Sequence, residues 1–460
     1  MSFVRAQGRG VASAAALVTV LIAAFPGRGA ALERFCDPSF EDCRAPLLNL
    51  IANERAGIDV AFWFMEDSRY SSALIARFNA GVPIRVLMDP RSNAKNPLNA
   101  DRLAELQAAG IPMRVRTASG ILHWKAMIFA GQNTVEFGGA NYSAWAFRPQ
   151  IPYVNYTDEV IHFTDNASIV NSFMTKFDTM WTDTIGFANY ANVFSPLVPR
   201  YGVYPKDPAL NFSPSENYGT RAVKRYNAET SKIDVIMFRI TDRRHTDAMI
   251  AAVQRGIPVR LITEPTEYRD PSRLWDAWNV DRLYAAGVQI KQRQHAGLDH
   301  GKLVLLYGQG MVIYGSSNWT SASSTTQEEH NHFLVDASAF NYFRNQFQRK
   351  WNNSAGFTEN VPFTPLPPQA PVYVGPASAS RQPTTVRLSW KPGYWAHKAD
   401  IYFGTTSNPP LFARDVPVSP NSTATYTLPP LAPGRTYYWR IVSKTMANKT
   451  AAGPVWNFGT

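Results

Sequence analysis

The chain has 460 residues, of which 45% are hydrophobic and 18% charged, a composition that excludes a disordered or fibrous protein and allows two or three folded domains. A formal net charge of +11 would indicate a nucleic-acid-binding surface if it were spread over the whole chain. However, residues 369–460 carry nine Lys or Arg and two Asp, and residues 1–31 carry three Arg and no acidic residue. Residues 32–368 are therefore close to neutral, which weakens a nuclease interpretation based on charge.

The first residues of the chain have the pattern of a signal peptide. Arg5 and Arg9 precede an apolar run from Val11 to Phe25, and the small residues Gly29 and Ala31 stand at plausible cleavage positions. The run is short for a transmembrane helix, although an uncleaved anchor is the alternative. We therefore expect residues 1–31 to be removed from a secreted or periplasmic protein.

The two cysteines of the chain, Cys36 and Cys43, lie close together just after this segment. In an exported protein such a pair is expected to form a local disulfide. Their spacing does not suit a zinc or redox site, and no second pair is present.

Two long parts of the chain repeat one another. Ile58-Asp59-Val60 returns as Ile233-Asp234-Val235, and the Gly-Val-Pro-Ile-Arg segment at 81–85 returns as Gly-Ile-Pro-Val-Arg at 256–260. Each copy alternates strands with amphipathic helices, which predicts two duplicated α/β halves, residues 32–185 and 230–361, forming one body. Residues 186–229 carry few periodic signals and are interpreted as a linking segment.

The strands expected in the two halves span 58–64 and 84–88, then 233–238 and 259–263. The helices expected between and after them span 71–80 and 100–109, then 246–255 and 280–286.

The C-terminal part has a different pattern. Several prolines in residues 362–371 indicate a linker, and residues 372–460 contain short alternating strands with no helical periodicity. This pattern predicts an all-β, immunoglobulin-like sandwich. With Trp390, the Leu431–Gly434 turn and the Tyr437–Arg440 strand, the segment resembles a fibronectin type III module.

Each half contains a His-x-Lys sequence followed, 18 residues after the histidine, by the Asn of a Gly-rich segment. A strand points residues i and i+2 to one face, so each His and Lys are expected to face the same way. The glycines let the next strand approach closely, and the Asn adds an amide donor. One His-x-Lys is weak evidence, but two copies at corresponding positions predict a paired site. Its residues are His123, Lys125 and Asn141 with His300, Lys302 and Asn318.

These motifs resemble those of the phospholipase D superfamily, whose signature is HxKxxxxD followed by GSxN, usually twice in a chain. The resemblance covers residues 36–350. The conserved Asp is replaced by Ala130 and Tyr307, and the first-half Ser by Gly139. The resemblance implies a phosphodiesterase with His123 as nucleophile and His300 as general acid and base.

The residue types also suit this chemistry. Two histidines can divide a phosphodiester displacement between them, one attacking phosphorus and the other moving the proton, while Lys and Asn donors stabilise the developing charge. No metal or cofactor is then required. A nucleophilic histidine needs an acceptor for its other nitrogen, and we nominate Glu159 and Glu329, with surface carboxylates as the alternative.

Other polar and aromatic residues near the motifs are open to two interpretations. His330 and His332 would suit a metal site, but no third ligand is evident in the sequence. Trp145 and Trp319 follow the two Asn residues and either line the mouth of the site or pack in a core.

The function that we expect is that of a secreted phospholipase D-type hydrolase, which releases phospholipid head groups at a membrane surface through a phosphohistidine intermediate. The alternatives are a secreted metal-independent endonuclease and, less favoured, an inactive binding protein. We expect a monomer with both half-sites in one chain. The basic C-terminal module would bind a polyanion or a surface.

Overall fold

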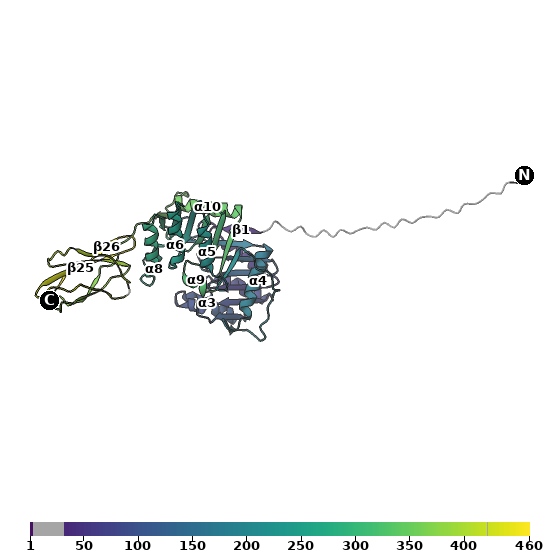
Figure 1. The fold of residues 1–460 in the computed structure, drawn as a ribbon. Coiled ribbons are helices and arrows are strands. Elements are labelled where there is room, and N and C mark those ends of the chain that lie inside the picture. The colour runs from purple at the N-terminus through teal and green to yellow at the C-terminus, as the bar shows by residue number, and fades with distance from the viewer. Residues whose placement is uncertain (3–31, 421) are drawn as a thin grey trace. The chain divides into compact units, whose positions relative to one another are not determined.

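The computed structural model describes residues 1–2, 32–420 and 422–460 (Figure 1). Residues 3–31 of the expected signal peptide lie outside the described residues. Leu32–Thr460 form one compact unit. No helix within the described residues is long and apolar enough to cross a membrane.

The repeated halves each form an eight-stranded mixed sheet, and the two sheets have the same strand order. The first sheet runs β1 (Glu33–Cys36), β8 (Ile161–Thr164), β6 (Thr134–Gly138), β5 (Lys125–Phe129), β2 (Ile58–Phe62), β3 (Ile84–Met88), β4 (Met113–Arg116) and β9 (Phe187–Ala191). The second runs β10 (Leu210–Ser213), β17 (Glu329–Val335), β16 (Met311–Gly315), β15 (Lys302–Leu306), β11 (Ile233–Met237), β12 (Val259–Thr263), β13 (Gln289–Arg293) and β18 (Asn360–Pro362). The structure therefore confirms the duplicated α/β fold.

The helices of the two halves also correspond. The first half contains α1 (Arg44–Asn53), α2 (Ser68–Asn79), the 3-10 helix η1 (Pro90–Ala94), α3 (Pro97–Ala108) and α4 (Ala167–Thr182). The second contains α5 (Tyr218–Asn227), α6 (Arg243–Gln254), α7 (Pro265–Tyr268), α8 (Leu274–Ala285), α9 (Ser321–Thr325) and α10 (Ala337–Asn352).

Helices α2 and α6 begin three residues earlier than the hydrophobic pattern indicated. Asp67 and Asp242 explain this, because their carboxylates accept from the backbone N–H groups of Arg69 and Arg244 and so cap the first turns. Helix α8 likewise extends the expected 280–286 segment back to Leu274.

Residues 186–229 contain more structure than their weak periodicity suggested. They contribute β9 to the edge of the first sheet, then β10 and α5 to the second half. Strands this short show little periodicity in sequence, and edge position leaves β9 mostly exposed.

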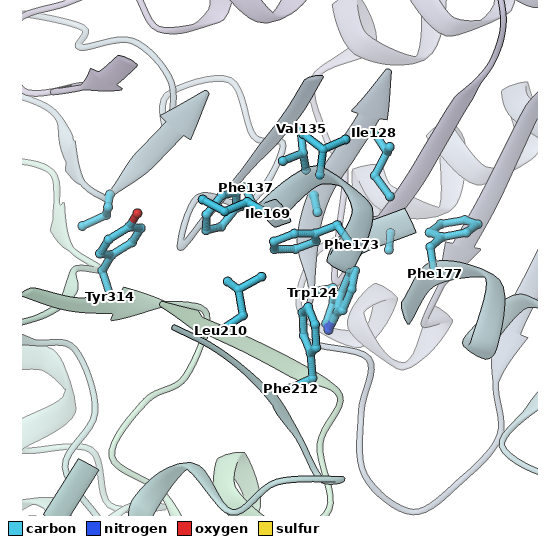
Figure 2. Close-up of a cluster of buried hydrophobic side chains, with 14 of the residues drawn as sticks. Trp124, Ile128, Val135, Phe137, Ile169, Phe173, Phe177, Leu210, Phe212 and Tyr314 are labelled. Atoms are coloured by element: carbon cyan, nitrogen blue, oxygen red, sulfur yellow. The ribbon is translucent and has the colours of Figure 1, made fainter. Parts of the chain in front are cut away.

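Hydrophobic side chains fill a core within each half and a third core between the sheets of the two halves (Figure 2). In this third core, Trp124 stacks on Phe212, with ring centroids 5.5 Å apart, and Phe137 stacks on Tyr314. Each fully buried aromatic or aliphatic side chain contributes about 1.5–3 kcal/mol to folding. The halves therefore fold against each other as one body.

The segment after the Pro-rich linker is all-β, as expected. One sheet contains β19 (Val372–Gly375), β21 (Arg387–Lys391) and β24 (Ala424–Thr427); the other contains β20 (Ser380–Arg381), β27 (Trp456–Gly459), β25 (Thr436–Lys444), β22 (Lys398–Gly404) and β23 (Leu411–Pro417), with β26 (Thr450–Ala452) beside β25. Side chains of β22 and β25 alternate between buried and half-exposed, and Trp390 and Trp439 are fully buried. Near the other end of the described chain, Cys36 and Cys43 form the expected disulfide.

Candidate active site

The two His-x-Lys motifs stand at corresponding strand starts. His123 lies just before Lys125, the first residue of β5, and His300 lies just before Lys302, the first residue of β15. The Lys125 ammonium donates to the carbonyl oxygen of His123, with 2.7 Å between nitrogen and oxygen, and Lys302 donates to the carbonyl of His300 in the same way. Both lysines are buried, so each motif is a fixed unit of one ring and one amine.

Glycine is required where each following strand passes the site. A Cβ at Gly138 would lie 2.0 Å from the Val160 carbonyl oxygen, and one at Gly315 would lie 2.2 Å from the His330 carbonyl oxygen. Without side chains here, the segment that carries each glutamate can approach the end of the strand that leads to each asparagine.

The two halves hold each other's histidine by the backbone. The His123 N–H donates to the Glu328 carbonyl at 2.9 Å, and the His300 N–H donates to the Asp158 carbonyl at 3.0 Å. The second contact belongs to a short parallel pair, β7 (Thr157–Asp158) with β14 (Leu298–Asp299). Each histidine is therefore positioned by the segment that precedes the glutamate of the other half.

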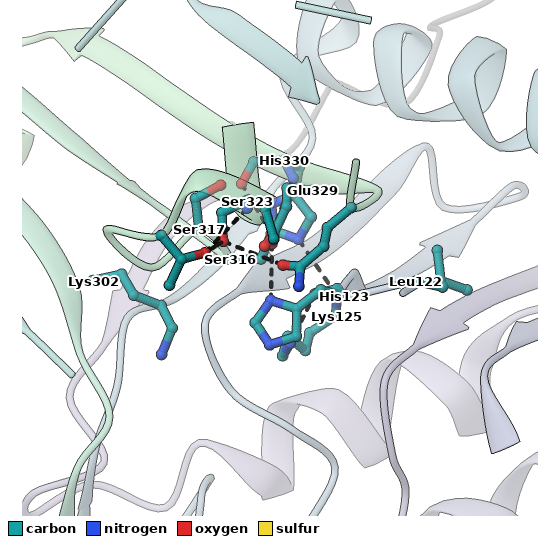
Figure 3. A network of polar contacts seen from close by, with 12 residues as sticks. Leu122, His123, Lys125, Lys302, Ser316, Ser317, Ser323, Glu329 and His330 are labelled. Atoms are coloured by element: carbon teal, nitrogen blue, oxygen red, sulfur yellow. Dashed lines mark hydrogen bonds and ion pairs between the residues drawn. The ribbon is translucent and has the colours of Figure 1, made fainter. Parts of the chain in front are cut away.

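The side chains make the same crossed pairing. His123 Nδ1 lies 2.9 Å from Glu329 Oε2, and His300 Nδ1 lies 2.6 Å from Glu159 Oε1. Figure 3 shows His123, Glu329 and Ser316 converging. Each nominated glutamate therefore contacts a histidine of the site, and in both cases it is the histidine of the opposite half. All four side chains are buried.

The two glutamates differ in their surroundings. The Ser316 hydroxyl donates to Glu329 Oε2 at 2.5 Å, whereas Gly139 occupies the corresponding position beside Glu159. Burial alone would raise the pKa of Glu329, but His123, Lys125 and the Ser316 hydroxyl hold it below its usual value. Burial raises the pKa of Glu159 to about 8, against the opposing charges of Lys302 and Lys125.

Both histidines of the site favour their neutral forms. Burial lowers the pKa of His123 to about 4 and, together with the Lys302 and Lys125 charges, moves the pKa of His300 well below its usual value. Burial also lowers the pKa of Lys302 to about 8. In both rings Nδ1 contacts a glutamate, so Nε2 remains available to a substrate. Both rings line the same pocket.

This pocket has a volume of about 480 Å³. Five of the eight residues expected in the site line it: His123, Asn141, Glu159, His300 and Asn318. Of the other three, Glu329 contacts the His123 ring, and Lys125 and Lys302 donate to the carbonyl oxygens of the two histidines. The pocket wall also contains Trp63 and Phe238, whose rings lie 6.4 Å from the His123 ring and 4.7 Å from the His300 ring.

Sequence reasoning did not select Trp63 or Phe238. Both are aromatic residues that immediately follow corresponding strands, β2 and β11, and this repetition was a visible signal. The sequence also did not distinguish Ser316 from its neighbours as a partner of Glu329.

The two tryptophans after the Asn residues have different roles. Trp319 is fully buried and stacks on His245 in the core of the second half, so a position at the mouth of the site is wrong for it. Trp145 is 46% exposed, beside the pocket-lining Ala146. Helix α5 explains the burial of Trp319, because Tyr226 packs against its ring.

His330 and His332 are both buried. Within the described part of the chain, no group of three or more His, Cys, Asp or Glu residues could hold a metal ion. The residues in place of the family's Asp are Ala130 and Tyr307, and Tyr307 donates its hydroxyl to Asp234 at 2.6 Å.

Two histidines in one pocket, supplied by duplicated α/β halves, define the phospholipase D-like class, whose members act on phosphodiester bonds. Residues 47–181 and 224–351 match the family model described as "Cardiolipin synthase, PLD-like domain", and the chain belongs to this family.

Known proteins resemble the chain in sequence and in fold. A "Mitochondrial cardiolipin hydrolase" of Chlamydomonas reinhardtii is 24% identical over 29% of this chain and 57% of its own length; the mouse protein of the same name is 26% identical over 30% and 59%. The chain thus spans somewhat over half of these relatives. The crystal structure of a phosphatidylserine synthase from Haemophilus influenzae has the same fold, with a TM-score of 0.54 at 12% identity, over 72% of this chain and 87% of that one.

Proposed function

We propose that the protein is an exported phospholipase D-type hydrolase that releases phospholipid head groups through a phosphohistidine intermediate. The observation that carries the proposal is the pair of crossed His–Glu contacts, which directs Nε2 of His123 and of His300 to one pocket. Two bases on opposite sides of one phosphorus are what a two-step displacement needs.

The pKa values of the two glutamates are shifted in opposite directions, and this difference supports different roles for the two histidines. Ionised Glu329 accepts the Nδ1 proton of His123, which leaves the Nε2 lone pair free to attack phosphorus. Protonated Glu159 donates to Nδ1 of His300, so that the proton of this ring is on Nε2. His123 is then the nucleophile and His300 the acid.

In the first step, a bond forms between His123 Nε2 and phosphorus, and the bond to the head-group oxygen breaks as that oxygen takes the Nε2 proton of His300, while the Glu159 proton passes to His300 Nδ1. In the second, Nε2 of His300 takes a proton from water as the Nδ1 proton returns to Glu159, and the hydroxide displaces His123 from phosphorus. Lys125, Lys302 and the amides of Asn141 and Asn318 stabilise the charge on the other phosphate oxygens. His300 and Glu159 together relay each proton in this sequence.

A phospholipid is the substrate that the surroundings favour. The body outside the termini is close to neutral, and aromatic or apolar side chains such as Trp63, Phe64 and Ile121 form part of the pocket wall. Cardiolipin hydrolases are among the similar proteins. A metal-independent endonuclease with the same chemistry is the second candidate, and the basic charge of residues 369–460 favours it.

We further propose that residues 1–31 are a signal peptide, that the protein acts outside the cytoplasm as a monomer, and that the C-terminal module is fibronectin type III-like. Its two sheets and buried Trp390 and Trp439 support a sandwich. Its basic excess suits binding to an anionic surface.

The test uses purified residues 32–460 in the presence of a chelator. Head-group release from mixed phospholipid vesicles is followed beside the loss of single-stranded and duplex DNA. His123→Asn and His300→Asn are compared with His397→Asn, a buried histidine of the C-terminal module. We expect the wild-type protein to release head groups from the lipid. Either site variant should lower this rate by at least roughly 10³-fold, and the control variant should keep it.

The two site variants also separate the roles. His123→Asn removes the nucleophile and prevents any covalent phosphoenzyme, whereas His300→Asn should accumulate it from a substrate with a leaving group that needs no protonation. DNA cleavage alone, lost in both variants, would assign the protein to the nucleases. No turnover of either substrate would contradict the hydrolase proposal and favour a binding protein.

A further inference from the structure

A second cavity, separate from the catalytic pocket, lies between the two halves. Its volume is about 710 Å³, and among the residues that the structure describes it shares no lining residue with the catalytic pocket. Strands β1, β8 and β17 and the first turns of α4 and α10 line it. The lining includes two exposed carboxylates, Glu33 and Asp336, and the buried rings of His162 and His332. None of these four residues takes part in the proposed reaction.

The two histidines are counterparts in the repeat, since each lies three residues after the nominated glutamate of its half. The Tyr314 hydroxyl joins them, at 2.9 Å from His162 Nδ1 and 2.8 Å from His332 Nδ1. The repeat places Phe137 opposite Tyr314, so a single hydroxyl bridges the two rings. On its other side, His162 Nε2 lies 2.7 Å from Glu33 Oε2. The four side chains therefore form one hydrogen-bonded chain that begins at Glu33 and ends at His332.

The direction of this chain follows from its first and last members. Burial alone would raise the pKa of Glu33, but its hydrogen bond with His162 helps to hold it below its usual value. Ionised Glu33 accepts the Nε2 proton of His162, so His162 Nδ1 accepts from Tyr314, and the Tyr314 oxygen accepts the Nδ1 proton of His332. Burial, with the charges of His162 and Arg221, lowers the pKa of His332 to about 3, so this ring is neutral. Its Nε2 atom is therefore a hydrogen-bond acceptor.

This last acceptor lacks a partner. His332 is 1% exposed and lines the cavity, and within the described part of the chain its Nε2 atom has no hydrogen-bond donor. The strand pairing explains the difference from His162. Phe35 is the register partner of His162 and Leu210 that of His332, so Pro208 occupies the position that corresponds to Glu33. A buried acceptor without a donor is costly, and a ligand in the cavity can supply that donor.

The charges around the cavity favour a cation. Glu33 and Asp336 lie close enough for the charge of Asp336 to act on the pKa of Glu33. Arg34 also lines the cavity, but it pairs with Glu41 at 3.4 Å. The first turns of α4 and α10 do not offer an anion site, because the side chains of Asn166 and Asp336 already accept from their N–H groups. Two carboxylates and a neutral acceptor together suit a ligand with a positive charge and N–H donors.

We propose that this cavity is a second ligand site, which binds a small organic ammonium compound. The ammonium group pairs with Glu33 and Asp336 and donates to Nε2 of His332. The apolar part of the ligand packs against Phe35 and Tyr342, whose ring centroids lie 5.5 Å apart and whose faces also attract a cation. The proposal does not depend on the proposed function, because no residue assigned to catalysis lines this cavity.

The test measures binding by calorimetry on residues 32–460 and requires no turnover. The probes are phenethylamine and 3-phenylpropionate, which share a ring and carry opposite charges. We expect phenethylamine to bind, and 3-phenylpropionate to bind at least roughly tenfold more weakly. The N-trimethyl derivative of phenethylamine keeps the charge but has no N–H donor, so it should also bind about tenfold more weakly than phenethylamine if His332 accepts from the ligand.

Two variants remove the charges of the site without removing side-chain volume. Asp336→Asn keeps a residue that can cap α10, and Glu33→Gln keeps an oxygen that can accept from His162; each should weaken phenethylamine binding about tenfold. Asp165→Asn is the matched control, because Asp165 does not line the cavity, and it should bind as the wild type does.

His300→Asn distinguishes this cavity from the catalytic pocket and should leave phenethylamine binding unchanged. Loss of binding in His300→Asn would place the amine in the catalytic pocket and overturn the proposal. Equal affinity for phenethylamine and 3-phenylpropionate would overturn it as well. So would an unchanged affinity in both Asp336→Asn and Glu33→Gln, with thermal unfolding showing that the two variants are folded.

Discussion

Ser316 and Gly139 occupy corresponding positions of the two halves, yet only Ser316 gives a hydroxyl to the nearby glutamate. The hydroxyl favours the ionised form of Glu329, while Glu159 lacks this donor and lies beside Asp158, whose charge also raises the pKa of Glu159. A serine cannot simply be restored at position 139, because a Cβ there would lie 2.6 Å from Glu159 Oε2. One side chain thus makes two otherwise equivalent half-sites chemically different.

Replacement of this hydroxyl should change the pH dependence of activity. In Ser316→Ala, Glu329 loses a donor, so its pKa rises and it becomes protonated at a higher pH. Protonated Glu329 no longer accepts the His123 proton, and the acid limb of the kcat/KM profile should therefore move upward by about one pH unit. Ser317→Ala is the matched control, because Ser317 accepts from Asn331 and not from the site. An unshifted limb in Ser316→Ala would show that the hydroxyl does not control Glu329.

At the scale of the elements, the short crossed segments position the two histidines more directly than the large sheets do. Residues around Leu122 pair with Glu328, and β14 pairs with β7, so each half inserts a segment into the other just before its histidine. Glycine permits both crossings. A Cβ at Gly120 would lie 1.7 Å from the Thr326 carbonyl oxygen, and one at Gly297 would lie 1.6 Å from the Tyr156 carbonyl oxygen.

Gly297→Ala should therefore separate β14 from β7 and displace His300 from Glu159. We expect a lower free energy of unfolding, by about 1–3 kcal/mol, and a loss of kcat/KM of at least roughly tenfold, since misplacement of a catalytic group is costly. Thermal unfolding and steady-state kinetics measure the two effects. In Gly459→Ala, the nearest atom to the new Cβ is 3.9 Å away, and both quantities should stay near wild type. A fully active Gly297→Ala would show that the crossing does not position His300.

Much of this arrangement was predictable from the sequence, because duplication repeats both the hydrophobic pattern and the motif. The α/β halves and the all-β C-terminal segment follow from the repeat and from periodicity. The crossing was not predictable: Glu159 and Glu329 follow the motif of their own half, and no local pattern indicates that they contact the other. Nor could Trp319 be distinguished from Trp145, because burial by α5 depends on tertiary packing.

At the scale of the whole molecule, the core between the halves makes the site a property of one chain. Trp124 and Phe137 of the first half pack against Phe212 and Tyr314 of the second, and the crossed His–Glu pairs lie beside this core. Each half alone would have a histidine without its glutamate and an exposed apolar face. A single polypeptide therefore contains both the crossed His–Glu pairs and the core that joins the two halves.

A mixing experiment tests this directly. His123→Asn and His300→Asn are unfolded together, refolded together and assayed on phospholipid, beside wild-type protein treated in the same way. Because His123 pairs with Glu329 and His300 with Glu159 within one chain, every refolded molecule should keep one defective histidine, and the mixture should stay inactive. If two chains exchanged halves, some sites would combine two intact motifs, and activity would return to roughly a quarter of the refolded wild-type value. Such recovery would contradict the single-chain site and would require an exchanged dimer.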